Sequence, residues 1–183
     1  MEVRTIAVIG AGVVGRAIAY AAALGGYTVV LEEVSDTIVA TAMAWIGESL
    51  VEDVRNGTLD TAGRDAALAR ISTSQVVDEA IRKAELIIEA VADELEMKLE
   101  LFTIFDKFAK SNAIFATAAT ALSIGDFSDI VVHREHCIGM RFVDAGAKMN
   151  QVEIVRAPET SEETVATCVA VVKRMGRQPV IHG

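Results

Sequence analysis

Apolar residues in this chain fall into two patterns that alternate along its length. Short runs rich in β-branched residues predict buried strands at residues 4–9, 28–31, 71–73, 86–91, 113–117, 137–142, 152–155 and 179–181. Between them, apolar residues at helical spacing predict helices at residues 13–24, 38–54, 62–69, 76–83, 95–108 and 165–172. Strands that alternate with helices predict an α/β fold of Rossmann type, which is a doubly wound, mainly parallel sheet with helices on both faces.

Turn and capping residues mark several of these boundaries. Gly25-Gly26 is expected to close the first helix, Asn56-Gly57 the second and Gly176 the last. Thr160 and Glu163 have the spacing of a capping box, which is expected to begin the last helix.

Composition and charge narrow the class of protein. The 183 residues are 52% apolar and 23% charged, which is typical of a globular domain with a sizeable core. The formal net charge is −9 and no cluster of Lys or Arg interrupts it, so neither nucleic acid nor an anionic membrane is an expected partner. Five glycines interrupt the nearly uncharged segment between Arg4 and Glu32, which argues against a membrane span or a signal peptide there.

The two cysteines point to no special chemistry. Cys137 and Cys168 are too few and too isolated to build a disulfide framework or a metal site. We expect both to be small buried hydrophobic residues. This cysteine usage fits a reducing cytoplasm.

A glycine-rich turn is the first candidate site. Gly10-Ala11-Gly12-Val13-Val14-Gly15 follows a predicted strand and opens a predicted helix, which is the context of a dinucleotide-binding turn. Gly10 allows the tight turn, Gly12 lets the backbone approach a diphosphate, and Gly15 lets helix and strand pack closely. Backbone N–H groups at the helix start, those of Val13 and Val14 among them, can bind phosphate despite the acidic net charge.

Two acids after the second strand indicate which dinucleotide is bound. Glu33 is expected to accept hydrogen bonds from the adenosine ribose hydroxyls, and its carboxylate would repel a 2′-phosphate. NAD is therefore expected rather than NADP. Glu32 is expected to be a solvated neighbour. The alternative is a glycine turn that packs but binds nothing.

Further segments share a family pattern with this turn. They are Ile6-Ala7-Val8-Ile9, Asn56-Gly57-Thr58-Leu59, Leu86-Ile87-Ile88-Glu89-Ala90-Val91, Lys98-x-x-Leu101-Phe102, Leu122-Ser123-Ile124, Ile138-Gly139-Met140, Val152-Glu153-Ile154-Val155 and Gly176-x-x-Pro179-Val180. Together they resemble the NAD-binding domain of 3-hydroxyacyl-CoA dehydrogenases, which oxidise the 3-hydroxyl of fatty acyl-CoA chains. The resemblance covers nearly all 183 residues.

The resemblance carries expectations about domains and partners. It implies that residues 1–183 form one NAD-binding Rossmann domain with a small-molecule substrate, an acyl-CoA. Members of the family normally continue into an all-helical domain that completes the substrate cleft and dimerises. We expect that domain to be absent here, which would leave either a monomer with an exposed apolar edge or a homodimer that covers this edge.

The resemblance also assigns residues to the cofactor. Ala90 and Val91 match the segment beside the nicotinamide, and Asp93 matches the acid that follows it, shorter by one methylene. Lys98 matches a lysine five residues further on, which is expected to contact the cofactor ribose or phosphate.

At the substrate end the match is incomplete. Thr120 falls on the serine that contacts the substrate hydroxyl, and we expect it to contact both substrate and cofactor. Glu153 falls on the glutamate that orients the catalytic histidine. Arg141 occupies the position of that histidine.

Arg141 changes the expected chemistry. Oxidation of a hydroxyl needs a base to take its proton, and imidazole titrates near neutrality. Guanidinium has a pKa above about 12 and cannot act as a base. An Arg141–Glu153 pair could instead bind an anion or close as a salt bridge.

Other residues are not expected to replace the base. His136 lies five residues earlier on the same strand, at the end away from the ligand. His182 lies beside the end of the sequence and is expected to be mobile. Glu153 or Asp144 would need a raised pKa, which Arg141 nearby would lower.

Three hypotheses fit these residues. The first is an NAD-dependent oxidoreductase of the 3-hydroxyacyl-CoA dehydrogenase type, impaired by Arg141. The second is a non-catalytic module that binds NAD(H). The third, weaker, is an oxidoreductase for an anionic hydroxy acid whose carboxylate Arg141 grips.

Overall fold

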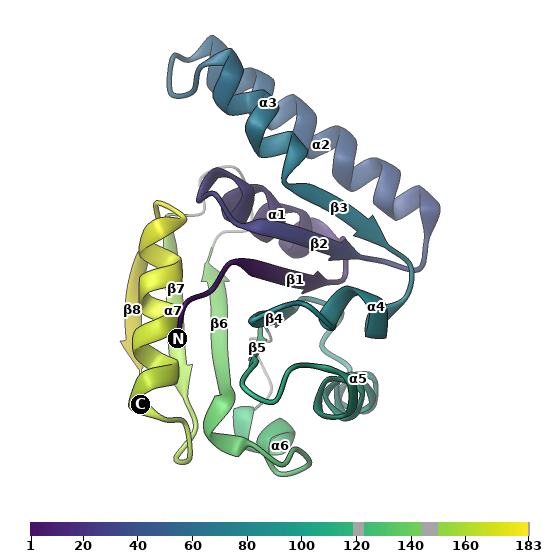
Figure 1. The fold of residues 1–183 in the computed structure, drawn as a ribbon, viewed down its shortest axis with the longest axis vertical. Coiled ribbons are helices and arrows are strands. Elements are labelled where there is room, and N and C mark those ends of the chain that lie inside the picture. Colours follow the sequence, from purple (N-terminus) through teal and green to yellow (C-terminus); the bar gives the residue numbers. More distant parts are fainter. Residues whose placement is uncertain (119–122, 144–149, 183) are drawn as a thin grey trace.

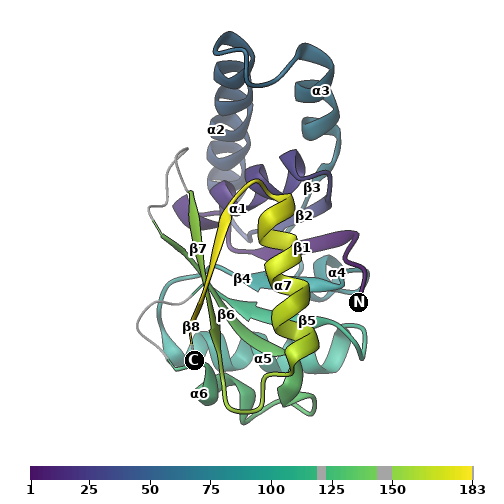
Figure 2. The same ribbon diagram turned by 90° about the vertical axis from the view of Figure 1, so that its left-hand side faces the viewer.

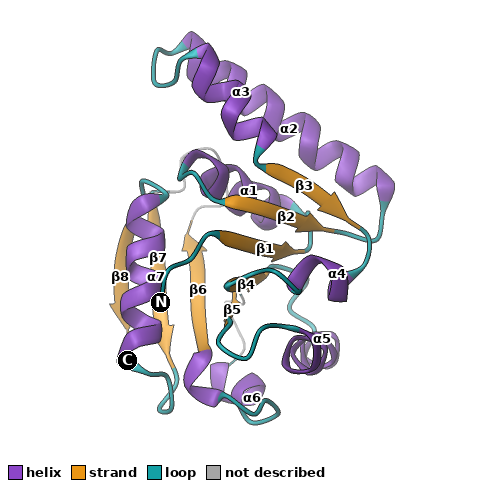
Figure 3. Ribbon diagram, in the orientation of Figure 1, coloured by secondary structure: helices purple, strands orange, loops and turns teal. Residues whose placement is uncertain are grey.

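One sheet of eight strands forms the framework of the computed structural model, which describes residues 1–118, 123–143 and 150–182 (Figures 1 and 3). The strands are β1 (Thr5–Ile9), β2 (Thr28–Glu32), β3 (Ile71–Ser74), β4 (Leu86–Glu89), β5 (Ile114–Thr117), β6 (Cys137–Val143), β7 (Gln151–Arg156) and β8 (Gln178–His182). Their order is β3-β2-β1-β4-β5-β6-β7-β8. β7 runs antiparallel to β6, and every other neighbouring pair is parallel.

This order confirms the predicted Rossmann-type sheet. The chain builds outward from β1 to β3 and then returns to lay β4 on the other side of β1. In open parallel sheets the point where the strand order reverses leaves a crevice at the carboxyl ends of the strands, and ligands bind there. The site is therefore expected where β1, β2 and β4 end.

Helices cover both faces of the sheet. They are α1 (Val13–Leu24), α2 (Asp36–Arg55), α3 (Thr61–Ala69), α4 (Val77–Ile81), α5 (Leu95–Phe108), α6 (Ile124–Ser128) and α7 (Glu162–Arg174). One apolar cluster packs α1, α2 and α7 on the first face, and a second packs α4, α5 and α6 on the other. The predicted arrangement of helices on both faces is confirmed.

The α2–α3 hairpin extends beyond β3, at the edge of the sheet (Figures 1 and 2). Trp45 of α2 fixes it against α1: the indole meets the Tyr20 ring edge to face, with centroids 5.9 Å apart. The Arg16 guanidinium lies 4.9 Å from the centroid of the same indole. The hairpin is thus tied to the helix that begins at the glycine turn.

Two local details differ from the sequence predictions. Ser161 caps α7 rather than Thr160, because its Oγ accepts a hydrogen bond from the N–H of Thr164 at 3.1 Å. Thr160 Oγ1 instead donates to the Cys137 carbonyl at 2.7 Å. α6 and the 3-10 helix Arg134–His136 were not predicted, since segments this short carry no helical period.

Both cysteines are buried and carry free thiols, as predicted. Burial raises the pKa of each thiol to about 12, so neither is a reactive thiolate near neutral pH. No helix among residues 1–118, 123–143 and 150–182 is long and apolar enough to cross a membrane.

Candidate functional site

The glycine turn between β1 and α1 has the backbone that the motif requires. Gly10 has φ of 96°, which favours glycine, and its N–H donates to the Glu32 carbonyl at 2.9 Å. A Cβ on Gly15 would lie 1.8 Å from the Gly10 carbonyl oxygen, so only glycine allows α1 to pack this closely. The tight turn and the close packing inferred from the sequence are both present.

Gly12, the middle glycine of the motif, faces open space. A Cβ on Gly12 would meet nothing within 4 Å, and Gly12 and Val13 are exposed. Gly12 is the N-cap of α1 and provides no side-chain cap, while the first amides of a helix lack partners within the helix. The exposed start of α1, with Val13 and Val14 in its first turn, therefore fits an anionic group such as a diphosphate.

Glu33 folds back onto this turn from the end of β2. Its Oε2 accepts a hydrogen bond from the N–H of Ala11 at 3.3 Å, and its Oε1 accepts one from the N–H of Ser35 at 3.2 Å. These bonds hold a half-buried carboxylate beside the glycine turn. This is where a ribose acceptor must lie if the turn binds the adjoining diphosphate.

Glu32 is not the solvated neighbour that we expected. Its side chain is 3% exposed. Alternation along β2 places it on the face of Val30, which packs against the cluster of α4 and α5. Burial, and the charge of Glu33 beside it, raise the pKa of Glu32 to about 7. The sequence prediction failed because a carboxylate at the end of a strand is normally solvated.

A cavity of about 400 Å³ lies beside the turn at the expected switch point. Gly10, Gly12, Ala90 and Val91 line it together with both glutamates, and α4 and α5 close it with apolar side chains. The structure thus brings the glycine turn, Glu33 and the segment after β4 together around one space.

A buried ion pair holds the segment after β4. Lys98 and Glu89 are each 0% exposed, and Lys98 Nζ donates to Glu89 Oε1 at 2.6 Å and to Oε2 at 2.7 Å. Glu89 also accepts hydrogen bonds from the N–H of Val91 at 2.7 Å and from Thr117 Oγ1 at 2.7 Å. One carboxylate therefore joins β4, β5 and α5.

That Glu89 joins these elements is not predicted from the sequence, which assigns Glu89 only to a buried strand. The sequence does contain an indication of this ion pair. Glu89 and Lys98 have opposite charges nine residues apart, and Lys98 lies on the face of α5 that buries Leu101, Phe102 and Phe105. Lys98 Nζ also lies 3.3 Å from Asp93 Oδ1, so it links the pair to the predicted nicotinamide end. Contact of Lys98 and Asp93 with the cofactor stays a prediction.

Arg141 and Glu153 lie opposite each other on β6 and β7. Arg141 borders a cleft of about 440 Å³. The cleft is also lined by Ser123 and Gly125 at the start of α6, and by Arg156 and Glu159 at and after the end of β7. Glu153 Oε1 lies 3.7 Å from His182 Nε2. Thr120 and Asp144 lie outside the described residues.

The two histidines considered as replacement bases occupy different places. His136 lies before the start of β6, away from Arg141 as expected, but it ends the 3-10 helix Arg134–His136 and does not belong to the strand of Arg141. The expectation of a mobile His182 is wrong, because this residue belongs to β8 and pairs in register with Val155. Its neighbour Glu153 faces it from the adjoining strand.

Comparisons with known proteins agree with this geometry. Residues 5–183 match the family model described as 3-hydroxyacyl-CoA dehydrogenase, NAD binding domain. The chain is 33% identical over 183 residues to the mitochondrial hydroxyacyl-coenzyme A dehydrogenase of Sus scrofa, covering 97% of this chain and 58% of the relative. It is 31% identical to a probable 3-hydroxybutyryl-CoA dehydrogenase of Bacillus subtilis, covering 98% of this chain and 62% of the relative.

The backbone is also similar to that of a solved structure. The 3-hydroxybutyryl-CoA dehydrogenase of Escherichia coli superposes with a TM-score of 0.94 at 29% identity, covering 99% of this chain and 38% of that chain. The chain spans 58% to 62% of the length of the two curated relatives above.

Replacement of Lys98 should destabilise the fold. Lys98→Met leaves the Glu89 carboxylate buried without its cation, so we expect the free energy of unfolding to fall by about 3–5 kcal/mol. The double variant Lys98→Met/Glu89→Gln should recover part of this loss, because no buried charge is left unpaired. Urea denaturation measures both, and equal losses in the single and double variants would contradict the role given to the pair.

Replacement of Glu32 should change how stability depends on pH. Because its pKa is raised from 4.5 to about 7, the folded protein binds more protons than the unfolded chain in that range, and stability falls as pH rises through it. Glu32→Gln removes this loss, so its advantage should grow with pH to about 1–3 kcal/mol above neutrality. The exposed Glu79→Gln serves as the control in urea denaturation at several pH values. A pH-independent difference between Glu32→Gln and wild type would show that Glu32 titrates normally.

Proposed function

This chain belongs to the 3-hydroxyacyl-CoA dehydrogenase family, and from that membership we propose that it is the NAD-binding part of an oxidoreductase acting on the 3-hydroxyl of an acyl-CoA, with proton transfer impaired by Arg141. The observation that carries the proposal is the exposed glycine turn with the Glu33 carboxylate folded onto it. These two features form a cradle for a diphosphate and its adjoining ribose.

The residues of this chain have separate tasks along the dinucleotide. The amides at the start of α1, those of Val13 and Val14 among them, bind the diphosphate, and Glu33 accepts hydrogen bonds from the adenosine ribose. The segment from Ala90 to Asp93 runs along the carboxyl edge of the sheet toward the nicotinamide half. Lys98 holds this segment in place, because its Nζ donates hydrogen bonds to Glu89 and to the Val91 carbonyl, and Glu89 in turn accepts one from the N–H of Val91.

Oxidation of a hydroxyl removes a hydride from carbon and a proton from oxygen. NAD supplies the hydride acceptor when it is bound. The proton needs a base, and Arg141 stands where the family has its histidine. A guanidinium, with a pKa above about 12, keeps its own protons and cannot take another. Thr120 and Glu153 are proposed to hold the substrate hydroxyl and to orient residue 141.

The same residue favours a second candidate, a module that binds NAD(H) without turning over a substrate. The cofactor cradle and the base are built by different parts of the chain. The cradle depends on the backbone of the glycine turn and on Glu33, whereas the proton transfer depends on the side chain at position 141. Loss of the base therefore leaves dinucleotide binding in place.

The substrate, the partner and the compartment are part of the proposal. Acyl-CoA is taken from the names of the relatives, and a homodimer from the family pattern. The single-domain organisation of residues 1–183 is proposed on the same basis. The cytoplasmic location suggested by the free cysteines also stays a prediction, since one relative is mitochondrial by name.

Restoration of the histidine tests the chemical step. We expect Arg141→His to oxidise 3-hydroxybutyryl-CoA with NAD about a hundredfold faster than wild type, in the range expected for a positioned base. Arg141→Gln is the matched control, because it removes the cation without adding a base. NADH absorbance follows turnover, and equal rates in wild type and Arg141→His would refute the impairment. Tight NADH binding with no turnover in any of the three proteins would favour the non-catalytic module.

Replacement of Glu33 tests the cofactor choice. Glu33→Gln keeps the side-chain length but removes the negative charge that would face a 2′-phosphate. We expect NAD to bind about tenfold more weakly, since a charge-assisted hydrogen bond is lost, and the preference for NAD over NADP to narrow. Calorimetric titration with both dinucleotides gives the ratio of dissociation constants. An unchanged ratio would exclude Glu33 as the ribose acceptor.

A further inference from the structure

A buried carboxyl group forms part of the wall of the cavity beside the glycine turn. Glu32 lines this cavity with Glu33, and apolar side chains supply most of the remaining wall: Val34, Val77, Val91, Met97 and Leu101. The cavity is therefore an apolar space with acidic groups at one end. Such a lining suits a flat aromatic ring that a few polar groups orient.

Glu32 has an unmet hydrogen-bonding capacity in this wall. Its Oε1 is buried and has no hydrogen-bond donor among the residues that the structure describes. A buried polar atom without a partner destabilises a fold, and a β-branched apolar residue would fit the end of this strand without that cost. An acceptor in this position calls for a donor supplied by a ligand.

The position of Glu33 indicates which part of the dinucleotide reaches Glu32. Glu33 is proposed to bind the adenosine ribose, and the adenine is attached directly to that ribose. Glu33 and Glu32 both line the same cavity, so a ribose bound at Glu33 would bring its attached base into this cavity. This step rests on the proposed function, in which the cavity receives the adenosine half of NAD.

We propose that the Glu32 carboxyl accepts a hydrogen bond from the exocyclic amino group of the adenine ring and thereby selects the base of the cofactor. The amino group is the only hydrogen-bond donor on the ring of this nucleotide. Glu33 then recognises the sugar and Glu32 recognises the base, from adjacent positions at the end of β2 and directly after it.

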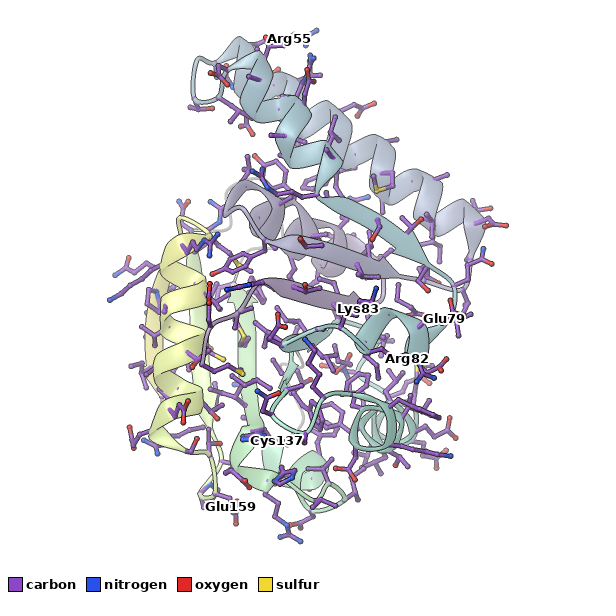
Figure 4. All side chains as sticks on the ribbon, in the orientation of Figure 1. Arg55, Glu79, Arg82, Lys83, Cys137 and Glu159 are labelled. Atoms are coloured by element: carbon purple, nitrogen blue, oxygen red, sulfur yellow. The ribbon has the colours of Figure 1, made fainter. Side chains whose placement is uncertain are left out.

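The charges around Glu32 are compatible with this contact. Charged groups on the neighbouring segments include Glu33 directly after β2, Glu89 on β4, Asp93 in the segment after β4, Lys98 on α5, Asp78 and Glu79 on α4, and Arg82 directly after α4. Lys98 is occupied by Glu89, and Arg82 Nη2 pairs with Asp78 Oδ2 at 2.5 Å. Glu79 of α4 and Arg82 directly after it are exposed (Figure 4), and the Arg82 guanidinium lies 5.3 Å from the centroid of the Phe108 ring. The base therefore meets an acceptor that forms no ion pair with a cation among the described residues.

Binding of two dinucleotides to wild type tests the contact directly. The probes are NAD and its etheno derivative, in which a bridge across the adenine amino group removes the donor. We expect wild type to bind NAD about tenfold more tightly than etheno-NAD, a difference of the size of one hydrogen bond. Calorimetric titration gives both dissociation constants. Equal affinities would overturn the proposal without requiring any variant.

Two variants separate the hydrogen bond from the shape of the cavity. Glu32→Gln keeps an acceptor oxygen at the same length, so it should retain the preference for NAD. Glu32→Val removes the acceptor and should bind NAD about tenfold more weakly, with the preference largely lost. Thermal unfolding checks that both variants fold.

The outcomes distinguish this contact from the proposed function. If wild type and Glu32→Val bind NAD with the same affinity and the same preference, the base contact is wrong and the NAD site stands. If wild type binds neither dinucleotide, the proposed function falls and the base contact falls with it.

Discussion

The buried ion pair between Lys98 and Glu89 is the constraint on which the carboxyl edge of the sheet depends. Two opposite charges without access to water must stay together, because separation would leave each of them in an apolar core. The same carboxylate takes hydrogen bonds from Val91 and Thr117, so β4, β5 and α5 cannot shift independently. This pair fixes the position of the segment from Ala90 to Asp93, and with it one wall of the cavity beside the glycine turn.

Most of the architecture could be predicted from the sequence because strands and long helices have distinct apolar periods. The geometry of the glycine turn and the position of Glu33 beside it could be predicted as well, since they follow from backbone sterics and from the order of two strands. Glu32 could not, because alternation along a short strand does not say whether its last residue lies under a helix or in water. Glu89 was hidden by an apolar run, and its function depends on a lysine that only folding brings near. The N-cap of α7 is Ser161 rather than the predicted Thr160, because the Thr160 hydroxyl bonds to the Cys137 carbonyl, a contact that the sequence does not reveal.

The structure places the proposed dinucleotide site and Arg141, the proposed position of the missing base, on different strands of the sheet. The proposed dinucleotide site consists of the backbone of the glycine turn, Glu32 at the end of β2 and Glu33 directly after it, on the side of the switch point where the chain first builds the sheet. Position 141 lies on β6, beyond β4 and β5 in the sheet order. A substitution there changes the available acid–base chemistry while the contacts among the glycine turn, Glu33 and Glu89 stay as they are. In the proposed function, this separation would let the cofactor cradle persist beside an arginine at the position that the resemblance assigns to the catalytic base.

The packing of Trp45 gives this protein an internal optical probe. It is the single tryptophan of the chain, and it stacks with Arg16, which follows the glycine turn by one residue. Indole emission depends on nearby charge and on exposure to water, and it overlaps the absorption band of a reduced nicotinamide. Movement at the start of α1, or arrival of a reduced dinucleotide beside it, would therefore alter the fluorescence of an unlabelled protein. The contact that anchors the α2–α3 hairpin thus makes the occupancy of the neighbouring site observable.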